Sequence, residues 1–405
     1  MLKRYFLNHS KRNFSTVSIW IEGGSDMDRI SQKGINKILC SLLTRGCEGF
    51  DNLALSQYIE FYGAELNQEV YEDGISISIK SLNEYFSKLL PLLNLIINKP
   101  TLSIIEFQKV KKSSLDLIKK DRENPFNICF EKWRKIVYSN HPYAFNTIGN
   151  SYDVSKITYE DVLFEFENFK TRKKYIISNN SEINGEDLET LNRRTIKEIS
   201  VPENCDSNPI NRFDCINNDS SQAIIMIGNQ TCSCKSNEYL PLKVLESYLS
   251  YGMSAALFKL FREKNGITYD VGVFNPIRNK NAPFLVYLSV SNKNAFFAFE
   301  LLSSLWKNLL LNPLTDNEIF LAKEKLKGSF LLGSQSVDEV LQRKIQSISF
   351  GVTPISEIDF NSKIDEISSL DIINLTNKYF SKPFLSISGN KKICLGIKNR
   401  WKKYF

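Results

Sequence analysis

The chain contains only two histidines, His9 and His141, which lie far apart in the sequence. Two histidines on successive turns of one helix are a common means of holding a catalytic zinc ion. No helix of this chain can present such a pair, because the two histidines are too far apart to share one. The sequence therefore excludes a metal site built on a helical histidine pair.

Cysteines could also bind a metal or form disulfides. Their spacing shows no disulfide framework in a chain of this length, so we expect free thiols in a reducing compartment. Cys232 and Cys234 are separated by one residue, which is closer than the C-x-x-C spacing of zinc knuckles. We interpret both as turn residues. The eight cysteines lie at positions 40, 47, 129, 205, 215, 232, 234 and 394.

The composition is that of a globular protein. The 405 residues, of which 42% are hydrophobic and 24% charged, suffice for two or three domains. The net charge is +7, but the lysines are scattered and form no basic block with interleaved aromatic residues, so we expect no nucleic-acid partner. The most apolar run, residues 89–97, contains Pro91 and Asn94 and is shorter than the roughly 20 residues that span a bilayer. We therefore expect a soluble protein with no membrane span.

The start of the chain is basic and has no acidic residue before Glu22, which is a feature of organelle transit peptides. The alternative is a short basic start that leads directly into the first strand. We favour this alternative, because residues 17–21 (VSIWI) already alternate as a strand does.

Strand patterns followed by helix patterns recur along the first half. Residues 17–21 and 75–79 alternate apolar and mostly small polar side chains, which predicts two strands. Apolar residues then return at helical spacing, which predicts a helix after each strand. The helices are expected at 35–43 and 86–97, from 105 to about 122 and from 158, and a closing strand is expected at 175–177.

The second half repeats this plan after a polar passage, which we interpret as a linker over 181–220. Two similar halves predict an α+β fold with two structurally similar domains, each a mostly antiparallel sheet packed on helices. We assign residues 1–180 to the N-terminal domain and 221–405 to the C-terminal domain. Strands are predicted at 223–227, 269–274, 285–290 and 384–387, and helices at 240–250, at 254–263, from 295 and from 316.

Several segments, taken in their order and spacing, resemble the insulinase and mitochondrial processing peptidase family. Residues 33–46 (KGINKILCSLLTRG) are similar to the helix that carries the family's inverted zinc motif, H-x-x-E-H. The most specific similarity lies in residues 252–269, which include LFREKNGITY. The resemblance covers nearly the whole chain and implies two peptidase-like domains that form half of a chamber. Further similar segments lie at 63–67, 141–149 and 323–329.

This resemblance places Lys37, Cys40 and Ser41 where the family has its first His, its general-base Glu and its second His. The family's third metal ligand, a distant Glu, falls at Leu117 or alternatively at Asp116. An ammonium group accepts no metal, and one thiolate beside a hydroxyl does not make a zinc site. Asp116 alone cannot complete the site. We therefore expect this chain to bind no metal or other cofactor and to hold no catalytic residue.

The second half keeps residues that the resemblance connects with substrate binding. In the family an Arg and a Tyr, at the positions of Arg262 and Tyr269, reach toward the bound peptide and donate hydrogen bonds near the carbonyl that zinc polarises. A guanidinium and a phenol can together stabilise a developing oxyanion. The alternative is a helix-capping Arg and a core Tyr near the turn at Gly266.

The family's chambers contain four such domains, and this chain supplies two. We therefore expect a heterodimer with a homologous active peptidase subunit that binds zinc, while this chain contributes to the binding of a peptide or presequence substrate. The peptide would add to a sheet edge near Asn67 or near its counterpart in the second half.

Two alternatives belong to other functional classes. The first is a structural or assembly subunit that resembles the core proteins of respiratory cytochrome bc complexes. The second is a zinc endopeptidase in its own right, which the histidine count disfavours. Because only Gly252 precedes Met253 where the mitochondrial regulatory subunit has a glycine-rich loop, we expect a plastid location or the bacterial cytoplasm.

Overall fold

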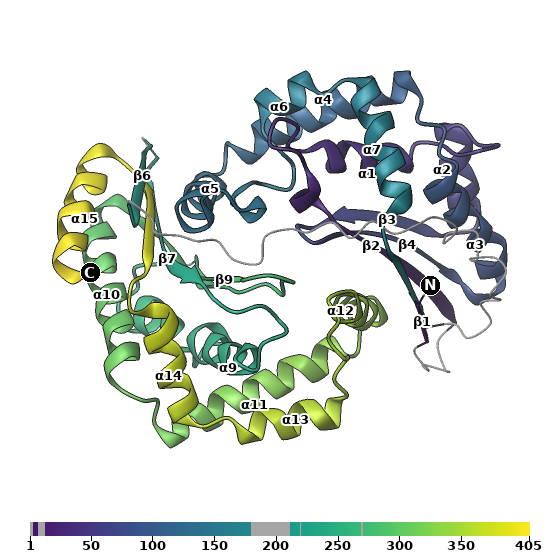
Figure 1. The fold of residues 1–405 in the computed structure, drawn as a ribbon. Coiled ribbons are helices and arrows are strands. Elements are labelled where there is room, and N and C mark those ends of the chain that lie inside the picture. Colours follow the sequence, from purple (N-terminus) through teal and green to yellow (C-terminus); the bar gives the residue numbers. More distant parts are fainter. Residues whose placement is uncertain (1–2, 7–12, 180–210, 219, 269) are drawn as a thin grey trace. The chain divides into compact units, whose positions relative to one another are not determined.

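The computed structural model describes residues 3–6, 13–179, 211–218, 220–268 and 270–405. The described residues form two compact units, and each contains one five-stranded sheet with helices packed on it (Figure 1). The predicted α+β class with two similar domains is confirmed. Unit 1 comprises residues 1–120, 145–201 and 334–354, and unit 2 comprises 121–144, 202–333 and 355–405.

The sheet of unit 1 has the strand order β1-β5-β2-β4-β3. Neighbouring strands are antiparallel, except that β1 is parallel to β5. At its centre Val17 lies opposite Ile79 and Ile19 opposite Ile77, and all four side chains are fully buried. Such β-branched side chains pack well on a pleated surface. The strands are β1 (Lys3–Phe6), β2 (Phe14–Glu22), β3 (Glu65–Val70), β4 (Gly74–Leu82) and β5 (Lys174–Ser178).

The sheet of unit 2 repeats this plan in the order β6-β10-β7-β9-β8, again with one parallel pair, β6 with β10. Buried Ile225 lies between Leu288 on one side and Ile387 on the other. The predicted linker, 181–220, is corrected at its C-terminal end, because this end contains strand β6. Residues 180–210 lie outside the described residues. The strands are β6 (Phe213–Asn217), β7 (Gln222–Gln230), β8 (Asp270–Phe274), β9 (Pro283–Ser291) and β10 (Phe384–Gly389).

Helices cover one face of each sheet, and their first turns carry the expected caps. Thr158 and Asp161 form a reciprocal capping box at the start of α7, as Ser368 and Asp371 do at α14. In unit 1 the helices are α1 (Ile35–Leu43), α2 (Asn52–Phe61), α3 (Asn83–Asn98), α4 (Ile104–Asp121), α6 (Ser151–Lys156) and α7 (Tyr159–Thr171). In unit 2 they are α9 (Tyr239–Ser250), the π-helix Phe258–Lys264, α10 (Ala295–Leu311), α11 (Asp316–Gly333), α13 (Glu357–Glu366), α14 (Ser369–Phe380) and α15 (Lys391–Tyr404).

Each unit also takes one helix from the other half of the sequence. Helix α5 (Pro125–Tyr138) packs on β6, β7 and β10, and helix α12 (Val337–Ser349) packs on β2 and β5. The second face of each sheet is therefore covered over its central strands, where serines are buried. Ser18 is 4% exposed, and Ser386 is fully buried and donates a hydrogen bond to the Cys129 carbonyl oxygen at 2.9 Å.

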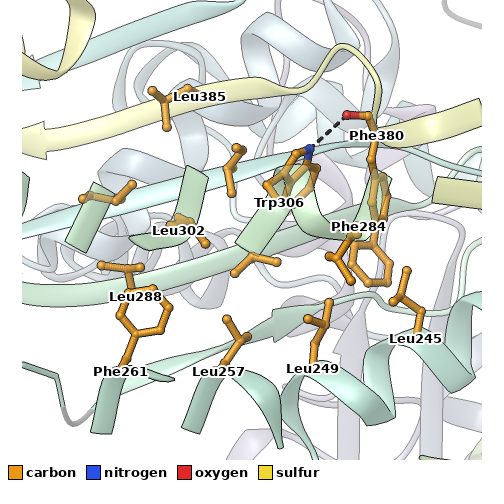
Figure 2. Close-up of a cluster of buried hydrophobic side chains, with 14 of the residues drawn as sticks. Leu245, Leu249, Leu257, Phe261, Phe284, Leu288, Leu302, Trp306, Phe380 and Leu385 are labelled. Carbon is orange, nitrogen blue, oxygen red and sulfur yellow. Dashed lines mark hydrogen bonds between the residues drawn. The ribbon is translucent and has the colours of Figure 1, made fainter. Parts of the chain in front are cut away.

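The core of unit 2 is built around large aromatic side chains (Figure 2). The indole Nε1 of Trp306 donates to the Phe380 carbonyl oxygen at 2.9 Å, so the buried N–H is satisfied. The ring of Phe380 lies 5.0 Å from that of Phe284 on β9. Leu245 and Leu249 of α9 belong to the same cluster (Figure 2). Helix α9 is thereby fixed against the sheet.

Within the part of the chain that the structure describes, no helix is long and apolar enough to cross a membrane.

Candidate functional site

Helix α1 carries the three residues that the sequence places at the family's metal motif. Its N-cap, Gly34, has a left-handed backbone with φ of 99°. A Cβ at Gly34 would lie 2.8 Å from the Ile148 carbonyl oxygen, and one at Gly149 would lie 2.2 Å from the Lys33 carbonyl oxygen. The two backbone segments therefore cross in contact, and only glycine allows this approach.

The Cys40 thiol of α1 is unsuited to metal binding or nucleophilic chemistry. The side chain is 1% exposed, whereas Lys37 and Ser41 are half-buried. Burial raises the pKa of Cys40 to about 12, with a small contribution from Glu69 and partial opposition from Lys37. Metals and electrophiles react with the thiolate, which this environment disfavours. Cys40 is thus a core residue at the position where the family has its general base.

A buried carboxylate holds the N-terminus of α1. Asp28 accepts hydrogen bonds from the backbone N–H of Gly34 at 2.7 Å and from Nδ2 of Asn36 at 2.8 Å. Nζ of Lys33 donates to the Asp28 carbonyl oxygen at 2.6 Å. Burial raises the pKa of Asp28 to about 6, although these hydrogen bonds and Lys33 oppose the rise. An acidic group at a helix N-terminus also complements the helix dipole.

A second buried charge, the guanidinium of Arg172 at the C-terminal end of α7, supports the same turn. Nη1 of Arg172 donates to Oδ1 of Asn36 at 2.9 Å and to the Gly23 carbonyl oxygen at 2.8 Å. Its other terminal nitrogen pairs with the carboxylate of Glu165, and both side chains are less than 8% exposed. Sequence reasoning did not identify Asp28, Asn36 or Arg172. The sequence signal that could have identified Asp28 is an acidic residue shortly before the start of a helix.

The proposed position of the third metal ligand lies on α4. Leu117 is 42% exposed, and Asp116 is exposed and lies 3.9 Å from Lys119. The next residue, Ile118, is 2% exposed and belongs to the core cluster that also contains Ile38 and Leu42 of α1. The core-facing position of this helical turn is therefore Ile118 rather than Leu117. Neither residue has a side chain that can ligate a metal.

Zinc does not fit this set of side chains. A catalytic zinc needs three protein ligands drawn from His, carboxylate or thiolate, and the positions here hold an ammonium, a buried thiol, a hydroxyl and an aliphatic group. Throughout the described ranges, no group of three or more His, Cys, Asp or Glu side chains is arranged to hold a metal ion. His141, the described histidine, is buried, and its Nδ1 accepts a hydrogen bond from the Tyr143 N–H at 3.1 Å.

Arg262 lies in unit 2, on the π-helix Phe258–Lys264. Phe261, next to it, is fully buried and anchors this helix in the core. Arg262 is exposed, and its guanidinium lies 5.0 Å from the ring centre of Phe258. Tyr269 lies outside the described residues, so its predicted role stays a prediction. π-Helical segments often occur at functional sites.

Each unit presents an outer strand at the position where the peptide is expected to add. Among the described strands, β3 is outermost in the first sheet and β8 is outermost in the second. β3 contains Asn67, and its side chains alternate between exposed and half-buried up to Val70. An outer strand offers backbone N–H and C=O groups with which an extended peptide can pair.

Sequence profiles of two related domains match most of the chain. The profile described as insulinase, peptidase family M16, matches residues 4–151. The profile described as peptidase M16 inactive domain matches residues 174–326. The first match contains α1, and the second contains the π-helix with Arg262.

Relatives from bacteria match over nearly the full length. An uncharacterized zinc protease of Rickettsia felis is 23% identical over 90% of this chain and 89% of its own. A protein of Helicobacter pylori named non-peptidase homolog YmxG is 20% identical over 89% of both chains. The plastid location that we expected as one alternative gains no support from these bacterial relatives.

The fold also matches a solved structure described as a peptidase M16 inactive domain from Pseudomonas fluorescens. The TM-score is 0.87 at 20% identity, over 96% of each chain. At this identity the likeness concerns the fold alone. It agrees with the two sheets and their helices described above.

Proposed function

Because the chain belongs to the insulinase family of M16 peptidases as a degenerate, peptidase-like member, we propose that it is a non-catalytic subunit of a two-chain peptidase. In this proposal a homologous partner brings the zinc ion, and this chain helps to bind the peptide substrate. The observation that carries the proposal is the contrast between α1 and the π-helix. The first has lost every metal-binding side chain, and the second presents Arg262 to solvent.

The intact support of α1 favours a role that depends on a preserved fold. Asp28, Asn36 and Arg172 form one buried hydrogen-bonded network at the start of α1. Such networks are costly when any partner is missing. A network of this kind supports a well-defined fold, which a chamber wall requires.

In the proposed complex, Arg262 donates hydrogen bonds to the peptide close to the carbonyl that is attacked, and Tyr269 assists it. The guanidinium stays charged at any physiological pH and offers several donors in a fixed plane. The peptide backbone pairs with an outer strand, β3 or β8, as an added strand. The zinc ion of the partner subunit would supply the activated water for hydrolysis.

The test is purification of the native complex, followed by a peptidase assay of complexes that contain Arg262→Ala, Tyr269→Phe or both. Loss of one donor to a developing oxyanion is expected to lower kcat/KM about 100-fold with assembly retained. Arg400→Ala, which removes a half-exposed guanidinium elsewhere in unit 2, is the matched control and should leave activity unchanged.

Two results would contradict the proposal. Full activity of the double variant would show that this chain does not contribute to the reaction. A stable complex without peptidase activity would instead support a structural or assembly subunit.

A further inference from the structure

A cavity of about 270 Å³ lies within unit 2, beside the π-helix that carries Arg262. Its lining includes Tyr248 of α9, Leu305 of α10 and five residues of α11, together with residues of the π-helix. Arg262 itself does not line it. The cavity is therefore a feature separate from the proposed peptide contact.

Three lysines, Lys259, Lys264 and Lys325, line this cavity together with one acidic residue, Glu318. Formal charges of +3 and −1 leave an excess of +2. In the described parts of the chain, no carboxylate lies within ion-pair distance of these three ammonium groups. A concave site lined by charges of one sign attracts and concentrates the opposite ion.

The carboxylate of Glu318, whose charge is already counted in this excess, is held in place by neutral donors. It accepts hydrogen bonds from the backbone N–H of Thr315 at 2.9 Å, from its Oγ1 at 2.8 Å and from the Tyr248 hydroxyl at 3.1 Å. Burial would raise the pKa of Glu318, but these hydrogen bonds outweigh it and hold the pKa below its ordinary value. The acid is thus a fixed part of the wall.

The π-helical winding is what brings two of the lysines to the same cavity. Lys259 and Lys264 are five residues apart, and in an α-helix such residues point about 140° away from each other. The i to i+5 hydrogen bonding of a π-helix places them on the same side. Burial, together with the charge of Lys259, lowers the pKa of Lys325. The ammonium groups of Lys259 and Lys325 therefore repel each other, and an anion between them would relieve this repulsion.

Apart from Tyr248, Ser254 and Asn317, the rest of the wall is apolar. Leu260 and Leu305 are half-buried, and Leu321 is 41% exposed. An anion that fills this cavity would thus have a charged end near the lysines and an uncharged part against the leucines.

We propose that this cavity binds a small phosphate monoester, with the phosphate between Lys259, Lys264 and Lys325 and the organic group against Leu260, Leu305 and Leu321. A phosphate monoester carries a charge of roughly −1.5 to −2 at neutral pH, which matches the excess of +2. The ammonium groups supply charge-assisted hydrogen bonds to its oxygens.

The first experiment is calorimetric titration of the full chain with inorganic phosphate, phenyl phosphate and acetate. Phenyl phosphate is expected to bind more tightly than inorganic phosphate, and acetate more weakly than both. Lys259→Gln and Lys325→Gln should each weaken the binding of phenyl phosphate about tenfold, the loss of one charge-assisted hydrogen bond. Lys323→Gln removes the same charge from α11 without lining the cavity, so it should leave affinity unchanged.

The second experiment is lysine acetylation of the wild-type chain, read by mass spectrometry with and without phenyl phosphate. Protection of Lys259, Lys264 and Lys325 alone from acetylation would support the site, and this measurement requires no substitution. The proposal would be overturned if phenyl phosphate showed no saturable binding at physiological salt. It would also be overturned if Lys323→Gln weakened this binding as much as Lys259→Gln and Lys325→Gln do. Tighter binding of acetate would also overturn the choice of a phosphate.

Discussion

The carboxylate of Asp28 and the side-chain amide of Asn36 are joined by a buried hydrogen bond of 2.8 Å, and this contact fixes the first turn of α1. The helix that holds zinc in catalytic members of such a family is therefore still firmly placed. The side chains at the positions that the resemblance assigns to the metal, Lys37, Cys40, Ser41 and Leu117, do not fit a zinc ion.

Restoring three ligands should therefore restore a zinc site. Lys37→His and Ser41→His place two imidazoles on adjacent turns of α1, and Ile118→Glu adds a carboxylate from the core-facing side of α4. We expect the triple variant to bind one zinc ion per chain, measured by competition with a chromogenic chelator.

The matched control carries Leu117→Glu in place of Ile118→Glu. Because Leu117 is 42% exposed and Ile118 is 2% exposed, the control should bind zinc more weakly. Tighter binding by the control would show that Leu117, and not Ile118, occupies the ligand position.

Removing the Asp28 carboxylate should cost more stability than removing an ordinary helix cap. Asp28→Ala leaves the buried N–H groups of Gly34 and Asn36 without their acceptor, and we expect a loss of about 2–4 kcal/mol in the free energy of unfolding. Asp51→Ala removes the exposed cap of α2 and should cost about 1 kcal/mol. Equal losses in urea denaturation would contradict the role given to Asp28.

The titration of Asp26 should make the free energy of unfolding fall as the pH rises. Burial and the nearby carboxylate of Asp73 raise the pKa of Asp26 from 3.8 to about 8. The folded chain therefore binds this proton more tightly than the unfolded chain, and the associated stability is lost between about pH 4 and pH 8. Asp26→Asn can still accept the hydrogen bond from the Gly24 N–H.

We expect Asp26→Asn to match the wild type near pH 4 and to be more stable by about 5 kcal/mol at pH 8, because each pKa unit of the shift corresponds to about 1.4 kcal/mol. Urea denaturation at several pH values measures this difference. Asp116→Asn, which removes an exposed carboxylate of α4, controls for the change in net charge. A difference between Asp26→Asn and wild type that does not grow with pH would disprove the assignment.

Helix α5 packs in unit 2 and helix α12 packs in unit 1, although each comes from the other half of the sequence. This arrangement predicts which amide protons exchange faster in a variant. Ile345 of α12 is fully buried, so Ile345→Ala should cost about 2–5 kcal/mol. We expect faster amide exchange in β2 and β5, although Ile345 comes from the second half of the sequence. The control, Ile364→Ala in α13, is equally buried and should affect unit 2 instead. Faster exchange in β7 and β10 on Ile345→Ala would contradict the exchange of helices.

Periodicity was sufficient to predict the elements that have one apolar face. The alternation in residues 17–21 predicted β2, and the helical spacing of Ile35, Leu39 and Leu42 predicted α1. It could not show that Ser18 and Ser386 would be covered by α12 and α5. Small polar side chains are compatible with either solvent or a closely packed helix, and the choice depends on contacts between distant parts of the chain.

The site illustrates the same limit. Residue types alone were enough to predict that zinc does not fit Lys37, Cys40 and Ser41. The position on α4 depends on one residue of register, and only the packing distinguishes Ile118 from Leu117. The π-helical form of residues 258–264 was also out of reach, because π- and α-helices share their preferred residues.

Zinc stoichiometry tests most directly whether this chain is a degenerate subunit that relies on a partner. The native complex should be purified and analysed for metal, and the two chains should then be separated without a chelator and analysed again. We predict one zinc ion for each pair of chains, all of it with the partner subunit. Stoichiometric zinc in the separated chain that carries Lys37, Cys40 and Ser41 would contradict this prediction.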